Sequence, residues 1–174
     1  MYVGMRHREL QSLLIRAGLV NREAMEHAVR ATAGTPTTWL EHLVAHKLVA
    51  DDQVAALAAS ECFVPLCDVG CLERVADDVI ALVPWDVAIE YRAVPVGLED
   101  GDLRLAMLDP CDDLAFEELQ FFLGGQRLLR EVAPATPLAW ALHRYYGHRS
   151  ALWPAQPRPT LRSQPALRTV QAAV

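Results

Sequence analysis

The side chains with the clearest potential for metal chemistry are two histidines in the first third of the chain. His42 and His46 are four residues apart, which places both imidazoles on one face of a helix, as in helical zinc sites. In zinc proteases a glutamate follows the first histidine of such a pair, and this chain has Leu43 there. We therefore expect partly buried histidines at a packing seam, and no metal or other cofactor.

Four cysteines are a second possible source of chemistry. Cys62, Cys67 and Cys71 contain no CxxC pair, so they are a poor metal set, and we expect them to be small core side chains. Cys111 follows an Asp-Pro step at a predicted helix start, where a thiol can be activated, but no histidine can be placed beside it. Reduced thiols are the expectation for all four, because disulfides are rare in cytosolic proteins.

Paired carboxylates and aromatic residues fit structural roles better than catalytic ones. The pairs at positions 77–78, 112–113 and 117–118 are explained by helix starts and a solvated face. The tryptophans and tyrosines at positions 39, 85, 140, 145 and 146 are expected in the core or at a seam between subdomains. No GxxxxGK[ST] motif occurs, so the sequence predicts no phosphate-binding P-loop and no enzyme.

Composition and charge indicate which classes of protein this chain can belong to. The 174 residues are 52% hydrophobic, enough for a substantial core, and the formal net charge is −6. No acidic residue follows Glu131, whereas four arginines do so after position 147, so the preceding part is strongly acidic and unsuited to nucleic acid. We found neither a signal-peptide pattern nor a long apolar run, and we therefore expect a cytoplasmic protein without direct membrane insertion.

The elements that position these residues begin with two similar helical hairpins. Apolar residues recur at helical spacing from Leu10 to Ala17, and Gly18 is a natural helix C-cap before the Leu19-Val20 turn. The pattern returns 29 residues later around Leu48-Val49, after a Gly-Thr-Pro break. Residues 1–62 are thus predicted to be a helical subdomain made of a repeated hairpin.

The second part predicts a small sheet covered by helices. A helix is expected from Asp77 to Ala88, ending or interrupted near Pro84, and strands at 93–98 and 103–108 flank a Glu-Asp-Gly-Asp turn. A helix at 114–123, a strand at 127–132 and a last helix at 137–146 follow. The fold class is therefore α+β, with an α-β-β-α-β-α sandwich at 63–147 and a disordered Pro- and Arg-rich tail at 148–174.

This order resembles the N-terminal domain of the traffic ATPases of type II secretion and type IV pilus systems, of the GspE and PilB type. A related branch of that family is the MshEN receptor domain for cyclic di-GMP. The resemblance covers about residues 9–147 and lacks the ATPase motor. The matching segments are AGLV (17–20), VPLCDV (64–69), LVPWDVAIEYRAVPVG (82–97), LRLAMLDP (103–110) and HRYYG (143–147).

In the nucleotide-binding branch, each hairpin resembles a pattern of Arg-Leu-Gly, a later Gly before the turn and a closing Gln. The matching positions in this chain are Glu9, Leu10, Gln11, Leu14, Gly18 and Thr32, then Thr38, Trp39, Leu40, Leu43, Lys47 and Glu61. The apolar part of the pattern is kept and most of the polar part is lost. Because an Arg–guanine contact contributes roughly 1–3 kcal/mol, losing two of them would weaken nucleotide binding by about 2–6 kcal/mol.

By resemblance, the chain is expected to be a non-enzymatic protein-interaction or regulatory module. The expected partner is a secretion or pilus ATPase or an inner-membrane platform component. The alternative is a sensor that binds cyclic di-GMP or another nucleotide on the apolar face shared by the two hairpins. The replaced polar positions make cyclic di-GMP the less favoured partner.

Overall fold

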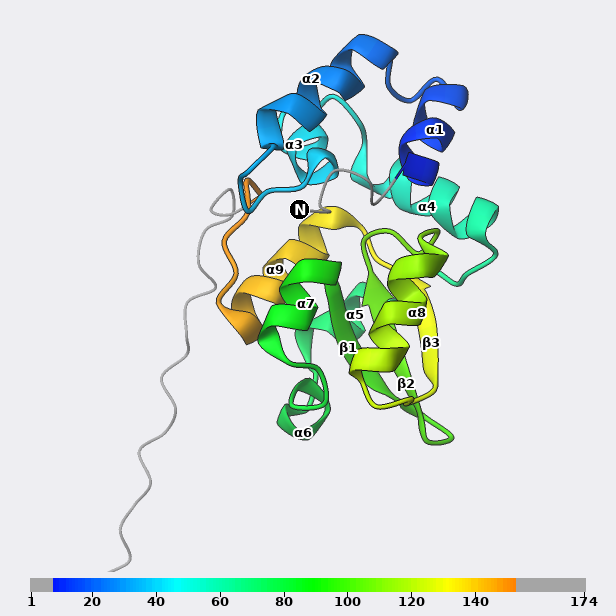
Figure 1. Ribbon diagram of the computed structural model, residues 1–174, viewed down its shortest axis with the longest axis vertical. Coiled ribbons are helices and arrows are strands. Elements are labelled where there is room, and N and C mark those ends of the chain that lie inside the picture. Colours follow the sequence, from blue (N-terminus) through cyan, green and yellow to red (C-terminus); the bar gives the residue numbers. More distant parts are fainter. Residues whose placement is uncertain (1–7, 153–174) are drawn as a thin grey trace, which may run out of the picture.

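A computed structural model describes residues 8–152 of the chain and shows two layers (Figure 1). Four helices, coloured blue to cyan, form the upper layer, and a three-stranded sheet with its covering helices forms the lower one. This is the predicted α+β arrangement. The bounds of the upper helices are α1 (Arg8–Arg16), α2 (Arg22–Thr32), α3 (Trp39–Ala45) and α4 (Asp51–Cys62).

The predicted repeat is visible in the backbone of the upper layer. At the α1–α2 turn the amide of Leu19 donates to the carbonyl of Leu14 over 3.0 Å, and 29 residues later Leu48 donates to Leu43 over 2.9 Å. Gly18 and Lys47 occupy equivalent positions, and both have left-handed φ angles, of 70° and 56°. The two turns are thus closed by the same C-terminal helix motif, although only one of them carries glycine.

The lower layer begins with three short helices, α5 (Val69–Glu73), α6 (Asp77–Ile80) and α7 (Trp85–Tyr91). The helix expected over 77–88 is therefore interrupted before Pro84, as its sequence suggested, while α5 was not foreseen. Strands β1 (Ala93–Glu99) and β2 (Asp102–Met107) then pair antiparallel around Asp100 and Gly101, whose φ angles of 52° and 89° match the predicted hairpin turn.

The rest of the lower layer follows the predicted order. Helix α8 (Asp113–Phe122) crosses from β2 to β3 (Leu128–Val132), which pairs parallel to β2, and α9 (Ala135–Tyr146) packs against β1. Asp112 caps α8, because its carboxylate accepts a hydrogen bond from the amide of Ala115 over 2.9 Å. The acidic pair at 112–113 thus has the helix-start role expected for it.

Among the contacts that join the two layers are two polar contacts and a covalent one. The carboxylate of Asp51, the first residue of α4, accepts hydrogen bonds from the amides of Ala135 and Thr136 over 2.5 and 2.8 Å, at the start of α9. Buried Glu41 on α3 lies 3.5 Å from the guanidinium of buried Arg92, just after α7.

The third contact is a disulfide that joins Cys62, at the end of α4, to Cys111, just before α8. Their Cα atoms are 5.4 Å apart, within the ordinary range for such a bond. The expectation of reduced thiols was therefore wrong for these two residues, and it holds for Cys67 and Cys71. Sequence spacing missed the bond because the two residues come from different layers of the fold.

Two further expectations concern aromatic residues and the tail. Trp85 is 66% exposed, so its assignment to the core or a seam was wrong, whereas the hydroxyls of Tyr145 and Tyr146 donate to backbone carbonyls of the α5–α6 region. Residues 148–152 lie against the body, with His148 buried. The rest of the predicted tail, 153–174, lies outside the described residues, and the subdomain boundary at residues 62–63 stays a prediction.

Candidate functional site

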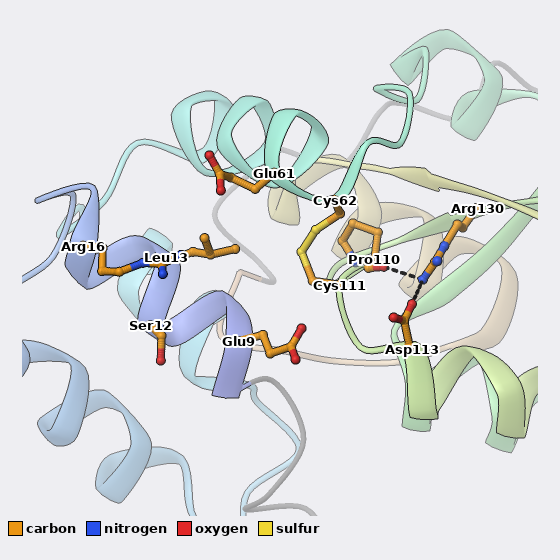
Figure 2. A pocket seen from close by; sticks show the side chains of 10 residues that line it. All are labelled: Glu9, Ser12, Leu13, Arg16, Glu61, Cys62, Pro110, Cys111, Asp113 and Arg130. Atoms are coloured by element: carbon orange, nitrogen blue, oxygen red, sulfur yellow. Dashed lines mark hydrogen bonds and ion pairs between the residues drawn. A yellow bond between two sulfur atoms is a disulfide. The ribbon is translucent and has the colours of Figure 1, made fainter.

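A cavity of ≈ 600 Å³ lies between α1, α4 and the segment that leads into α8 (Figure 2). It is open to solvent, and the disulfide between Cys62 and Cys111 forms part of its wall. The residues that line it are Glu9, Ser12, Leu13, Arg16, Glu61, Cys62, Pro110, Cys111, Asp113 and Arg130.

The spacing of residues on α1 explains which side chains reach this cavity. Leu10 and Leu14 are fully buried in the core and fix the orientation of the helix. Positions 9, 12, 13 and 16 then form a separate stripe, at the i, i+3, i+4 and i+7 spacing of one helix face, and this stripe faces the cavity. Glu61 enters from the last turn of α4, so two positions of the predicted nucleotide pattern meet here.

The charges around the cavity do not favour a phosphate-bearing ligand. Three carboxylates, those of Glu9, Glu61 and Asp113, face two guanidinium groups among the described lining residues. One of these, Arg130, donates to the carboxylate of Asp113 over 2.6 Å and to the carbonyl of Pro110 over 2.9 Å, and it also lies over the Phe116 ring. Its positive charge is therefore largely compensated within the protein.

The cavity also lacks a catalytic set. Among its described lining residues, Ser12 carries a hydroxyl group, and none of these residues is a histidine that could accept its proton. The two sulfur atoms are joined in the disulfide and cannot act as a nucleophile. The predicted absence of catalytic residues in the chain as a whole remains an expectation.

The other predicted positions have mainly structural roles. Five of them are buried in the hydrophobic core: Leu10, Leu14, Trp39, Leu40 and Leu43. Gly18 and Lys47 form the two left-handed turns, and Thr38 caps α3 by accepting a hydrogen bond from the amide of Glu41. The Thr32 hydroxyl donates to the carbonyl of Ala28 over 2.9 Å, and Gln11 is half-buried.

The histidine pair lies on the upper layer, away from this cavity. The His42 ring is 4.1 Å from that of His46 and 6.0 Å from that of His27 on α2, measured between centroids. Partial burial, and then the charges of His46 and His27, lower the pKa of His42. His42 is half-buried as expected and His46 is exposed; within residues 8–152 no group of histidine, cysteine or acidic side chains is arranged to hold a metal.

Comparison with known proteins shows what this fold is similar to. Residues 72–152 match the MshEN domain, from α5 through α9. A structure of MshE with cdg (cyclic di-GMP) has a TM-score of 0.52 to this chain and 29% identity, over 79% of this chain and 98% of that one. This part of the chain is thus similar to the MshEN domain. The predicted resemblance is thereby confirmed.

The similarity extends beyond the residues that match the MshEN model. The N-terminal domain of XpsE has the same fold, with a TM-score of 0.56 and 24% identity over 79% of this chain and 94% of that one. Because residues 72–152 are less than half of the chain, a match over 79% of it includes part of the α1–α4 layer. The structural relatives thus support the two-layer fold as a whole.

The chain is also similar in sequence to two type IV pilus assembly ATPases. It is 27% identical over 140 residues to the type IV pilus assembly ATPase PilB of Myxococcus xanthus, and 29% identical over 119 residues to PilB of Thermus thermophilus. The first match covers 80% of this chain and the second 67%. The chain spans 24% and 13% of the length of these relatives, so it corresponds to a small part of each.

Sequence reasoning missed the other lining residues: Ser12, Leu13 and Arg16 on α1, Cys62 at the end of α4, and four residues that lie within 72–152. Pro110, Asp113 and Arg130 surround the end of the Cys62–Cys111 bond, but they are distant from α1 in sequence. The Asp-Pro step and the predicted β3 strand were recognised individually. Nothing in either pattern indicated that they would face α1.

Cys67, by contrast, is placed as expected. Burial, followed by the nearby carboxylate of Glu131, raises the pKa of the Cys67 thiol to about 12. The thiol therefore stays protonated at neutral pH and is a core side chain rather than a nucleophile. Arg104 holds Glu131 in place, because its Nε donates to the Glu131 carboxylate over 2.6 Å.

Proposed function

We propose that this protein is a non-enzymatic protein-interaction module that acts in the cytoplasm, docking on a component of a secretion or pilus machine. The observation that carries the proposal is the combination of a retained MshEN fold with a changed ligand surface. Glu9 and Glu61 stand at positions where the nucleotide-binding pattern has arginine and glutamine, and they line the same cavity.

The physical argument against a nucleotide is electrostatic. Two carboxylates at the rim repel a ligand that carries phosphates, while Arg130 is already paired with Asp113. A docking role does not need free cationic side chains in this cavity, because a few well-packed anchor residues supply most of the affinity of a protein interface. The absence of a P-loop motif from the sequence supports a role other than ATP hydrolysis.

The proposed cytoplasmic location is supported by the similarity to type IV pilus assembly ATPases. Within residues 8–152 no helix combines the length and apolar character that crossing a bilayer requires. The Cys62–Cys111 bond is unusual for a reducing compartment, so we expect it to respond to the thiol–disulfide balance of the cell.

Affinity capture of the tagged chain from its native host, followed by mass spectrometry, tests the docking role. We expect enrichment of a secretion or pilus ATPase, or of an inner-membrane platform component, over a matched unrelated acidic protein. Capture that repeatedly returns no component of such a machine would contradict the proposal.

The second candidate is a cyclic di-GMP sensor, and it is favoured by one observation, the similarity to MshE solved with cdg. Titration calorimetry with cyclic di-GMP separates the two functions. We expect no binding at micromolar concentrations, because two lost guanine contacts weaken affinity by about 2–6 kcal/mol. Saturable micromolar binding of cyclic di-GMP, made tighter by Glu9→Arg, would support the sensor function and contradict the protein-interaction function.

A further inference from the structure

Helix α8 packs beside α7 in the lower layer (Figure 1) and carries three exposed apolar side chains. Leu114, Phe121 and Phe122 are 67%, 82% and 58% exposed. With Glu90, Tyr91, Glu117 and Glu118 they line a shallow hollow of ≈ 370 Å³ between the two helices, and these seven residues are called the α8 face below.

The fold itself does not require these apolar side chains. Helix α8 buries Ala115 and Leu119 in the core. Leu114 and Phe121 lie on a different side of the helix, about 100° away from this buried stripe, and Phe122 lies at the edge of the buried stripe on that side. An apolar group of this size that the core does not use indicates a contact surface.

The α8 face is held in a defined shape. Tyr91 is almost fully buried, its hydroxyl donates to the Glu118 carboxylate over 2.8 Å, and its ring centroid lies 6.3 Å from that of Phe122. Phe121 and Phe122 contact each other edge to face, with centroids 6.1 Å apart. The aromatic rings therefore lie on an ordered base rather than on a loop.

The charge of the α8 face limits the kind of partner that it can bind. Glu90, Glu117 and Glu118 line the α8 face, and among its described lining residues there is no lysine or arginine. An acidic rim repels anionic lipid headgroups and nucleic acid, and it also opposes the same face of a second copy of this chain. It attracts a segment that presents basic side chains on either side of an apolar stripe.

The spacing along α8 fits an amphipathic helix. Leu114 and Phe121 are seven residues, or two helical turns, apart, which is about 10.5 Å along the axis. A helix that lies in the groove between α7 and α8 presents apolar residues at the matching i, i+3 or i+4, and i+7 positions.

We infer that the α8 face binds a basic amphipathic helix of a partner protein. Leu114, Phe121 and Phe122 contact the apolar stripe of that helix, and Glu117 pairs with its arginine or lysine residues. The inference rests on the proposed interaction function and specifies its surface and the chemistry of its partner.

The direct test uses two fluorescent synthetic peptides and the full chain. Each peptide is a helix of about 18 residues with leucine on one face, and the other face carries arginine in one peptide and glutamate in the other. We expect fluorescence anisotropy to show at least tenfold tighter binding of the arginine peptide. We expect the double variant Phe121→Ser/Phe122→Ser to weaken that binding at least tenfold, and Glu117→Lys to reduce its salt dependence.

The matched control is Phe63→Ser. Phe63 is 94% exposed, but it lies at the end of α4 and outside the α8 face. This variant should bind the peptide like the wild type, and the melting temperatures of all variants should be unchanged. Equal binding of the two peptides, or an equal effect of Phe63→Ser, would overturn the inference.

Two further outcomes separate this inference from the broader proposal. If the native partner is captured as well by the Phe121→Ser/Phe122→Ser variant as by the wild type, the docking function stands and the α8 face is not its surface. If the variant R158E/R162E/R168E binds the arginine peptide tenfold more tightly, the face is occupied by this chain's own C-terminal residues, and a separate partner helix is excluded.

Discussion

Breaking the Cys62–Cys111 bond should lower the free energy of unfolding more than any other change that removes no packed side chain. The bond joins residues 49 apart in sequence, and it connects α4 to the start of α8. Closing a loop of that length lowers the chain entropy of the unfolded state, which corresponds to about 4 kcal/mol of folding stability at 25 °C. This is a large fraction of the ~5–15 kcal/mol that stabilises a typical domain.

Urea unfolding of the wild type, Cys62→Ser, Cys111→Ser and the double variant measures this contribution. All three variants should lose a similar amount, because each removes the same bond. Reductant should lower the wild type to the level of the double variant and leave the double variant unchanged. Cys71→Ser, at a half-buried free cysteine, is the matched control and should unfold like the wild type.

A thiol count gives an independent answer. Titration of the denatured wild type without reductant should reveal two free thiols, those of Cys67 and Cys71. Four free thiols, or a wild-type urea midpoint that does not respond to reductant, would refute the reasoning. In that case the two cysteines would be close neighbours rather than a covalent link between the layers.

Three more predictions concern the contacts between layers and pH. Asp51→Ala should lower the free energy of unfolding by about 1–3 kcal/mol in urea titrations, because two amides at the start of α9 lose their acceptor. Glu41→Gln should lower it by about 3–5 kcal/mol by leaving buried Arg92 without its counter-charge, and the combination with Arg92→Met should restore part of the loss. The pKa of His42 is lowered on folding, so the unfolded chain binds a proton at His42 more tightly than the folded chain does. The free energy of unfolding should therefore fall as the pH drops below 6.5. His42→Gln should reduce this loss in melting curves recorded from about pH 7.5 to about pH 5.

The upper layer was predictable because its signals are local. The Leu-Val turns, the apolar helix faces and the Gly18 cap each act over one or two helical turns. The turn and the apolar faces recur 29 residues later, with Lys47 in the place of Gly18. The β1–β2 hairpin was predictable for the same reason, since Gly101 supplies the positive φ that its turn requires. Where the determinants of structure lie within a few residues of each other, sequence patterns suffice.

The cavity was not predictable, because it is formed by segments that are distant in sequence. Its wall combines α1, the end of α4, the segment after β2 and a side chain from β3. The disulfide has the same origin, since Cys62 and Cys111 meet only when α4 packs beside the sheet. The exposure of Trp85 was missed because of a local assumption: an apolar residue at the start of a helix was expected to face the core.

The kept and lost parts of the nucleotide pattern differ in what the fold requires of them. The kept apolar positions, such as Leu10, Leu14 and Trp39, are buried in the core, so any sequence that folds this way must retain them. The turn geometry survives at Lys47 even without glycine. Glu9 and Glu61 lie on the surface, where the fold tolerates any polar residue. We therefore expect the apolar half of the pattern to depend on the fold alone. Under the proposed function, only the polar half would depend on a ligand, and we propose that this half is replaced here by carboxylates and other side chains.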